Sequence, residues 1–415
     1  MKSLRVLLAV FVVSLFSISS GAIASSMFSI EDLSYEGAVR FKDGVYGESR
    51  LGFANGTFAV DSKNNLIYIV GHQNDQAVGV YGLAEFSKAE SIAELPMSRN
   101  VQPFIDILDR AASGNPHDLD RITGMAFIED NLVLNAARYY DAGGSITDTT
   151  LVIEGYQDLK NSEVSGFYSL EGRVHAAGWM TPISGPLRLK TSADYIFGFA
   201  SNLPINLRNS MGPSAFAVNT DDLFNIQPGQ IISSTALLDF SVENQLRDDH
   251  YNESGTNDVW TEVSKAFVGL IIPGTNTYAV FGFSAGHEYG VGYKIVQDTG
   301  NTCGGACPKV ASDRYNYYWL WDVDDFIDVL DGNKEPHELE PYEYGRLNLP
   351  FEINADGSAP NVMMAANYDP DNQKLYFLIG DADRLQSRFE SLPILLRYSI
   401  NFGSRPGAPS NVSVE

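Results

Sequence analysis

The feature that most constrains the fold is a recurrence of short, apolar, β-rich segments along nearly the whole chain. One class of segment comprises residues 65–71, 130–136, 194–200, 277–283 and 374–380. Each is preceded by a second strand-like segment, and in most cases a turn such as PGTN or DPDNQ joins the two, as a tight hairpin requires. Helical periodicity is scarce, so we expect an all-β protein.

A third class of segment follows each pair after a longer polar gap, and a weaker fourth class, which includes residues 91–97, follows in most units as the expected outer strand. Four antiparallel strands repeated at a period of tens of residues predict a β-propeller. The last unit lacks its outer strand, whereas residues 33–41 are a spare strand near the N-terminus. Lending this strand to the last unit would close the ring and remove two free edges. The sequence therefore favours one propeller domain over residues 25–415 with five blades, and six or seven blades remain open alternatives.

The N-terminus has the pattern of a secretory signal over residues 1–24. Lys2 and Arg5 precede an apolar run, and Ala22, Ile23 and Ala24 give the small-x-small pattern that signal peptidase reads. No later segment approaches ~20 uninterrupted apolar residues, so we expect no membrane insertion. The expected product is a secreted or periplasmic protein, which we take to be a monomer.

Charge and cysteine usage narrow the partners further. The formal net charge is −24 at pH 7, which repels nucleic acid at long range. The only cysteines are Cys303 and Cys307, in the sequence CGGAC. In an exported chain this spacing predicts one local disulfide that holds a long loop in shape, rather than a metal site.

The propeller topology brings two kinds of loop to one face of the disc, and these loops hold the candidate functional residues. The loops between the second and third strands of the blades carry His72, Asn74, Arg138, Tyr139, Tyr140, Arg208, His287, Tyr289 and Arg384. The connections between blades add His117, Asp120, Arg121, His175, Trp260 and Glu262. Irregular loops above a rigid scaffold are a common place for function, so we expect a site on this face.

The residue types on this face favour a polysaccharide lyase. Such an enzyme removes the proton next to a uronate carboxylate, which requires a base, an acid and a group that neutralises the carboxylate. We predict His287 or His72 as the base, Tyr139 or Tyr289 as the acid, and Arg138 or Arg208 as the neutralising group. The other predicted substrate-binding residues are Asn74, Tyr140, His117, Arg121, His175, Trp260 and Arg384. This composition is similar to the His/Tyr/Arg sites of secreted, seven-bladed propeller lyases that act on algal uronate polymers.

Two other functions stay open. The predicted scaffold also resembles that of several five-bladed glycoside hydrolase families, in which catalytic acids stand at the starts of innermost strands, as Asp120 and Glu262 do here. Those families also have an aspartate on the first inner strand, where this chain reads RLGFANGTF and has no acid before Asp61. The third reading is a propeller that binds a polysaccharide or oligosaccharide without cleaving it. No cofactor is assigned, and a divalent metal near the axis remains an open alternative.

Overall fold

The computed structural model describes residues 27–141, 143–200, 210–227, 230–353 and 359–401. Within these ranges the protein is all-β, as the sequence predicts, and its strands follow one another with few helices between them. Residues 1–24, the predicted secretory signal, and Arg208 lie outside the described residues.

The largest sheet joins the two ends of the chain. Its strand order is β2-β3-β4-β5-β1-β23-β22-β21. The strands are β1 (Leu33–Phe41), β2 (Phe58–Asp61), β3 (Leu66–Val70), β4 (Val78–Gly82), β5 (Met97–Ile105), β21 (Met363–Asp369), β22 (Lys374–Asp383) and β23 (Leu392–Ile400). Neighbours are antiparallel except β1 and β5, which pair in parallel over two residues only.

Three sheets are formed by the middle of the chain. The orders are β13-β9-β8-β7-β6, β10-β11-β12-β14 and β15-β16-β19-β20. The strands of the first two are β6 (Arg121–Ile128), β7 (Asn131–Ala137), β8 (Asp148–Glu154), β9 (Glu163–Leu170), β13 (Ile231–Ile232), β10 (Met180–Pro182), β11 (Tyr195–Phe197), β12 (Ala215–Val218) and β14 (Ser234–Leu238). Those of the third are β15 (Lys265–Ile271), β16 (Thr277–Ala285), β19 (Arg314–Asp322) and β20 (Glu343–Arg346).

The remaining elements lie in the connections. A separate hairpin between β16 and β19 is formed by β17 (Val291–Tyr293) and β18 (Ala306–Pro308). The α-helices are α1 (Gly185–Thr191), α2 (Thr220–Asn225) and α3 (Val323–Leu330). Short 3-10 helices are η1 (Ile30–Asp32), η2 (Ile92–Glu94), η3 (Leu108–Arg110), η4 (Tyr156–Asp158), η5 (Arg173–Ala176) and η6 (Pro336–Glu338).

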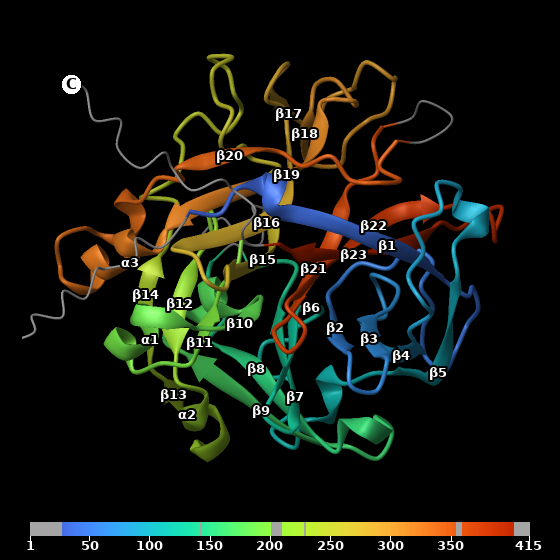
Figure 1. Ribbon diagram of the computed structural model, residues 1–415, viewed down its shortest axis with the longest axis horizontal. Helices are drawn as coiled ribbons and strands as arrows, with labels where there is room; N and C mark the ends of the chain where they lie inside the picture. Colours follow the sequence, from blue (N-terminus) through green and yellow to red (C-terminus); the bar gives the residue numbers. More distant parts are fainter. Residues whose placement is uncertain (1–26, 142, 201–209, 228–229, 354–358, 402–415) are drawn as a thin grey trace, which may run out of the picture.

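The sheets are arranged around a common centre (Figure 1). Strand β2 contacts β6, β6 contacts β10, β10 contacts β15, β15 contacts β21, and β21 returns to β2. Apolar side chains fill the space between adjacent sheets; Phe197 and Phe216, for example, pack in one cluster with Ile128 and Val133 of the preceding sheet. Burial of these side chains is the main favourable contribution to folding. The five strands β2, β6, β10, β15 and β21, which contact one another in turn, line the middle of the molecule.

The N-terminal strand β1 pairs with β23 as the sequence suggests. Its register runs from Leu33 opposite Ile400 to Arg40 opposite Ile394. A buried ion pair reinforces this closure, because Arg40 Nε lies 2.9 Å from Asp383 Oδ2 and Arg40 Nη2 lies 3.0 Å from Asp383 Oδ1. Segments more than three hundred residues apart in sequence are thereby held in one sheet.

One strand differs from the sequence-based expectation. Residues 91–97 were expected to supply the outer strand after β4, but they contain η2, and the strand β5 begins only at Met97. Only Ser98 and Phe104 of β5 are buried, so the strand has no clear apolar alternation. An outer strand with little buried surface gives a weak sequence signal.

Candidate functional site

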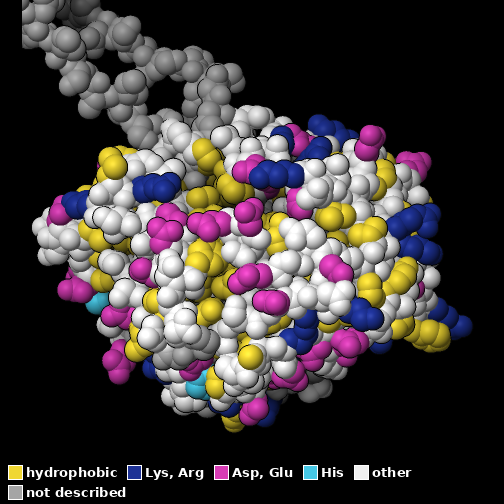
Figure 2. All heavy atoms as spheres, turned by 90° about the horizontal axis from the view of Figure 1, so that it is seen from below, with side chains coloured by type: hydrophobic (Ala, Val, Ile, Leu, Met, Phe, Trp, Pro, Cys, Tyr) yellow, Lys and Arg dark blue, Asp and Glu magenta, His cyan; other side chains and the backbone are white. Residues whose placement is uncertain are grey.

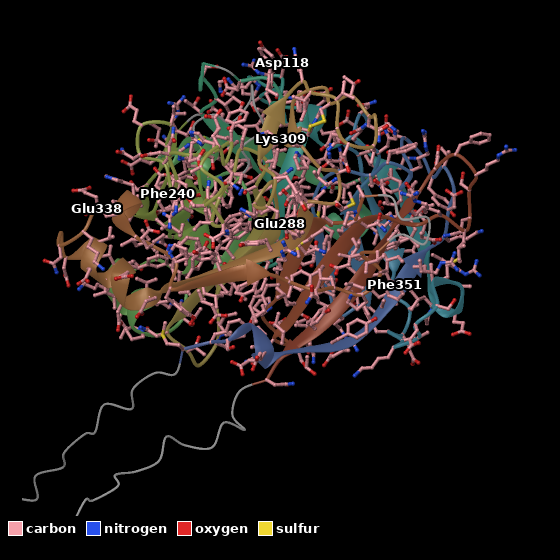
Figure 3. All side chains as sticks on the ribbon, turned by 90° about the horizontal axis from the view of Figure 1, so that it is seen from above. Asp118, Phe240, Glu288, Lys309, Glu338 and Phe351 are labelled. Atoms are coloured by element: carbon pink, nitrogen blue, oxygen red, sulfur yellow. A yellow bond between two sulfur atoms is a disulfide. The ribbon has the colours of Figure 1, made fainter. Side chains whose placement is uncertain are left out.

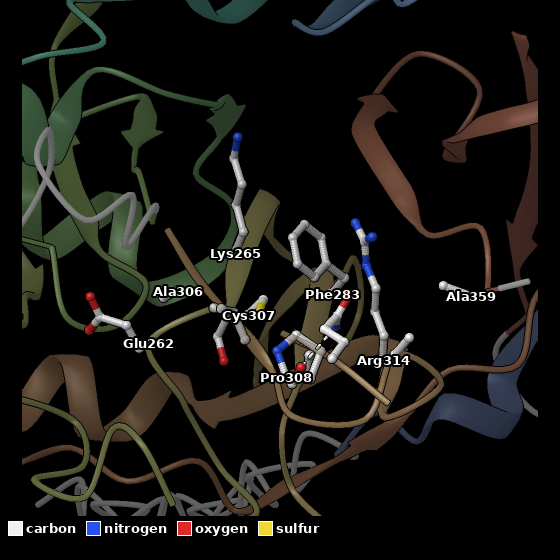
Figure 4. A pocket seen from close by; sticks show the side chains of 13 residues that line it. Glu262, Lys265, Phe283, Ala306, Cys307, Pro308, Arg314 and Ala359 are labelled. Atoms are coloured by element: carbon white, nitrogen blue, oxygen red, sulfur yellow. Dashed lines mark hydrogen bonds between the residues drawn. The ribbon is translucent and has the colours of Figure 1, made fainter. Parts of the chain in front are cut away.

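A cavity of about 280 Å³ lies where β15 begins and β16 ends. Its lining includes Lys265 of β15, Phe283 and Ala285 of β16, Arg314 of β19, Glu262 from the segment before β15, and Cys307 and Pro308 of the β17–β18 hairpin. Figure 4 shows Lys265, Phe283 and Arg314 projecting to the same side, with the phenyl ring between the two cations. The cavity thus combines one aromatic ring with two basic groups.

The local sequence of the paired strands explains this placement. Lys265 pairs directly with Phe283, and the ladder is irregular at Phe267, between Ala266 and Val268. Gly282 permits the close approach of the strands, since a Cβ atom there would lie 1.9 Å from the Lys265 carbonyl oxygen. The lysine ammonium lies 5.2 Å from the centre of the Phe267 ring, and the rings of Phe267 and Phe283 are 6.0 Å apart.

The two cations form no ion pair at contact distance in the described part of the chain. The guanidinium of Arg314 lies 5.0 Å from the centre of the Phe283 ring, and neither it nor the Lys265 ammonium makes a hydrogen bond or an ion pair with a described residue. Burial, and to a lesser degree the positive charge of Arg121, lowers the pKa of the Lys265 ammonium to about 8. Burial also lowers the pKa of Arg314, and Asp381 acts in the opposite direction.

The β17–β18 hairpin forms one wall of the cavity. The predicted disulfide between Cys303 and Cys307 is present, and Cys307 faces the cavity. The side chain of Gln297 donates to the carbonyl oxygen of Pro308 at 2.8 Å, and the Asp298 carboxylate accepts the backbone N–H of Ala311 at 2.8 Å. These bonds hold the wall against the start of β19.

His287, a predicted base, lies behind the cavity wall rather than in its lining. Its Nδ1 donates to the carbonyl oxygen of Asn257 at 2.9 Å, which leaves Nε2 to accept the Ser284 hydroxyl at 2.7 Å. The Ser284 hydroxyl lies 2.6 Å from that of Ser264, which does line the cavity. Burial lowers the pKa of the imidazole. The histidine therefore reaches the cavity only through two hydroxyl groups.

The turn that follows His287 is held by one carboxylate. Asp313 accepts the backbone N–H groups of Glu288 at 3.1 Å and Tyr289 at 2.8 Å, and the hydroxyl of Tyr315 donates to it. The side chain of Tyr289 points outward and is exposed. Figure 3 places Glu288 near the middle of its view and Asp118 and Glu338 near the rim.

The other predicted histidines each have protein partners. Nδ1 of His72 accepts the backbone N–H of Asn74 at 3.2 Å, and Nε2 of His117 lies 2.8 Å from the Asp148 carboxylate. The ring of His175 is bonded to the carboxylate of Asp239.

The remaining predicted residues fall into small local groups. The Arg121 guanidinium lies 4.9 Å from the Tyr139 ring centre and 3.5 Å from the Asp120 carboxylate. Arg138 donates to the Tyr140 carbonyl oxygen at 2.9 Å, and Arg384 donates to the carbonyl oxygen of Asp381 at 3.2 Å. Trp260 is fully buried against Trp319, at 4.9 Å between ring centres. No contact joins His72, Arg138 and His287 to one another within the described ranges.

Sequence reasoning missed Lys265, Arg314 and Phe283. The available signal was a charged residue at the start of an otherwise apolar strand, as in KAFVGLIIPG and in RYNYYWLW. Of the residues that were predicted, Glu262 lines this cavity, and the charge of Arg121 reaches Lys265.

Among the described residues, no three His, Cys, Asp or Glu side chains are grouped so that they could hold a metal ion. No helix in the described ranges is long and apolar enough to cross a membrane.

No protein-family model matches the chain, and no curated protein matches it. Two solved structures are similar to it. An endosialidase of phage phi92 has a TM-score of 0.34 and 8% identity over 92% of this chain, and the chain spans 60% of that protein's length. A thermostable family-43 glycoside hydrolase has a TM-score of 0.37 and 10% identity, over 90% of this chain and 100% of the other. At these TM-scores neither likeness carries an argument about fold or function.

Proposed function

We propose that this chain is an exported β-propeller of five blades that holds an acidic polysaccharide in the cavity beside Lys265 and cleaves it by β-elimination. Five blades are supported by the closed series of contacts from β2 through β6, β10, β15 and β21 back to β2. Each of these strands begins a run of antiparallel strands, and β1 completes the last run by pairing with β23. The proposal includes export from the cytoplasm and a monomeric state.

The observation that carries the functional proposal is a pair of cations, Lys265 and Arg314, that form no ion pair with any described residue. Acidic side chains are spread over the face shown in Figure 2, and the chain has a net charge of −24. Both side chains are partly buried, and a charge that is partly removed from water without a counter-charge is destabilised. A protein that is rich in carboxylates, and whose described residues leave these two cations unpaired in one cavity, is therefore suited to a ligand that brings its own negative charge.

A uronate fits both chemical features of the cavity. Its carboxylate matches the planar donors of Arg314, which can bind two oxygens at once. The apolar face of its sugar ring matches the phenyl ring of Phe283, which lies between the cations. An aromatic ring beside charged donors is typical of pockets that orient a polar ligand on an apolar surface.

The chemistry of the lining favours elimination over hydrolysis. Hydrolysis of a glycosidic bond uses two carboxyl groups that flank the bond. Among the described residues that line the cavity, Glu262 is the one carboxylate. Asp120, its predicted companion, instead accepts the backbone N–H of Tyr139 at 2.6 Å and pairs with Arg121. Elimination needs a neutralised carboxylate and a base, and the two basic side chains can provide these.

The test combines binding with turnover. The mature protein and its Arg314→Gln variant are titrated calorimetrically with uronate oligosaccharides, and the ultraviolet absorbance of the unsaturated product is followed on polymannuronate, polyguluronate and polygalacturonate. Arg314→Gln loses a charge-assisted, bidentate interaction with the uronate carboxylate that contributes about 1.5–3 kcal/mol, so its affinity should be about 10–100-fold lower. Arg188→Gln, on the exposed side of α1, is the matched control.

The outcomes separate the three functions. Binding with no absorbance change and no new reducing ends would leave a glycan-binding protein. New reducing ends without absorbance would indicate hydrolysis, and loss of this activity in Glu262→Gln would locate it. Equal binding by the wild type and by Arg314→Gln would contradict the proposed site.

A further inference from the structure

We infer that Lys265 both removes and returns the proton in the elimination, so that the substrate is a uronate joined through O4 in which H5 and O4 lie on the same face of the ring. This inference rests on the proposed function and adds to it the base, the acid and the configuration of the sugar. The uronates that satisfy it are those of gluco and manno configuration. In galacturonate and guluronate the two groups lie on opposite faces.

The position of Lys265 gives it access to the ligand. The side chain starts at the first residue of β15, one of the strands that line the middle of the molecule, and extends into the cavity (Figure 4). Arg314 projects to the same side beyond the Phe283 ring. A carboxylate bound by Arg314 would place the ring carbon that bears it, and the hydrogen on that carbon, between the two cations.

Burial, and to a lesser degree the positive charge of Arg121, favours the unprotonated form of Lys265. Arg121 of β6 and Arg314 of β19 are positive, and Glu262 before β15 is the one acidic residue of the described lining. A lysine that is desolvated among like charges loses its proton more easily than one in water, which is how lysine bases are activated in proteins. The pKa of about 8 leaves a useful fraction of free amine near neutral pH.

The reaction balances with this one side chain. The Nζ lone pair takes H5, the C5–H electron pair forms the C4=C5 double bond, and the C4–O4 bond breaks. Arg314 compensates the negative charge that develops on the carboxylate as H5 leaves. The Lys265 ammonium then gives its new proton to O4 of the departing sugar, which leaves the amine as it began. No oxidant, reductant or metal takes part.

The stereochemical restriction follows from the lining. Apart from Lys265, Arg314 and Glu262, the described lining residues have no group that titrates, and no Tyr or His is among them. One amine can serve both C5 and O4 only when H5 and O4 are on the same side of the ring. A substrate with the opposite arrangement needs a second proton donor on the other side.

The experiment compares epimers and lysine variants. Polymannuronate is incubated in parallel with polyguluronate, its C5 epimer, and with polygalacturonate, and the initial rate of absorbance increase is measured from about pH 6 to about pH 10. We expect polymannuronate to be cleaved at least about tenfold faster than either other polymer. We also expect a rate that rises with pH through about 8 and then levels.

Two variants separate proton transfer from charge and folding. Lys265→Arg keeps the positive charge but has no proton to lose in this pH range, so it should bind a mannuronate oligosaccharide within a few-fold of the wild type and lose about 10²–10⁴-fold in rate. Lys265→Ala should regain rate with added primary alkylamines, to an extent that follows the amine's basicity.

Three results would overturn the assignment. The first is elimination that persists in Lys265→Arg. The second is preferred cleavage of polyguluronate with loss of activity in Glu262→Gln. The third is activity lost in Ser264→Ala but kept in Lys265→Arg, which would route the proton through Ser284 to His287. Failure of Arg314→Gln to change binding is a separate result, since it contradicts the proposed site whichever residue moves the proton.

Discussion

Removing the charge of Asp383 should destabilise the protein strongly, because this residue and Arg40 form the buried ion pair that holds β1 against the last sheet. The side chain of Asp383 is fully buried, and that of Arg40 is 7% exposed. Asp383 also accepts the backbone N–H of Leu385 at 3.0 Å and the side-chain amide of Gln386 at 2.7 Å.

The magnitude follows from this burial. Asp383→Asn keeps the shape of the side chain but leaves the Arg40 guanidinium buried without a counter-charge, which costs about 3–5 kcal/mol. That is a change of about a hundredfold or more in the folding equilibrium constant. Arg40→Met should cost less, because the carboxylate keeps the two donors from Leu385 and Gln386. The double variant should cost less than the sum of the single variants, since neither charge is then left alone.

The assay is equilibrium unfolding in urea, with midpoint and slope compared among the four proteins. Glu36→Gln is the matched control on the same strand. Its carboxylate pairs with Arg397 at 2.8 Å and also with Lys374, but all three side chains are about a quarter to a third exposed, so the loss of both pairs should be about 2 kcal/mol or less. Two results would refute the inference that this ion pair closes the fold. One is a free energy of unfolding for Asp383→Asn within about 1 kcal/mol of the wild type, and the other is a double variant whose loss of stability equals the sum of the two single losses.

Three further predictions concern the surroundings of the cavity. Burial lowers the pKa of His287 below 6.5, so the unfolded chain binds more protons than the folded one just below that pH, and the free energy of unfolding should fall as the pH drops through this range. His287→Phe should make the free energy of unfolding in urea less dependent on pH between about pH 7.5 and about pH 5.5. An unchanged pH dependence would assign the effect to other groups. Gly282→Ala should displace the start of β15, lower the stability by about 1–3 kcal/mol and weaken uronate binding. Gly82→Ala is the control and should leave the affinity unchanged, because its new Cβ would have its nearest neighbour at 3.6 Å. Equal effects of the two variants in calorimetry would contradict the inference that β15 and β16 need the close approach at Gly282. Replacing Cys303 and Cys307 by Ser opens a ring of only a few residues, so it should cost at most about 2 kcal/mol of stability. It should nevertheless weaken uronate binding, because Cys307 lines the cavity. Unchanged binding would show that the cavity wall does not need the disulfide.

Much of the fold could be predicted because the relevant signals are local. Alternating or continuous apolar runs, such as 277–283 and 374–380, lie in β16 and β22, and residues 33–41 form β1 with the expected bounds. The outer strand β5 was placed too early, since its side chains are mostly not buried. The disulfide was predictable because two neighbouring cysteines in a chain with a predicted export signal leave one simple pairing.

The site was less predictable, because a residue type does not reveal which way a side chain points. His287 and Trp260 look like binding residues in the sequence, yet the first has both ring nitrogens bonded within the protein and the second is buried beside Trp319. Lys265 and Arg314 look like ordinary strand-end charges. Only the packing of β15, β16 and β19 against one another shows that both reach one cavity, where no described side chain forms an ion pair with them.

The sequence by itself determined the all-β class, the order of the strands and the spare N-terminal strand, because hydrophobic alternation and turn chemistry act between neighbours in the chain. The tertiary structure alone decided where the cations converge, which histidines are engaged and which carboxylate faces the cavity. These depend on contacts between strand ends far apart in sequence, on the bulge at Phe267 and on the close approach at Gly282. The physical reason is that burial and pairing, which set the charge state of Lys265, belong to the assembled sheets and not to any one segment.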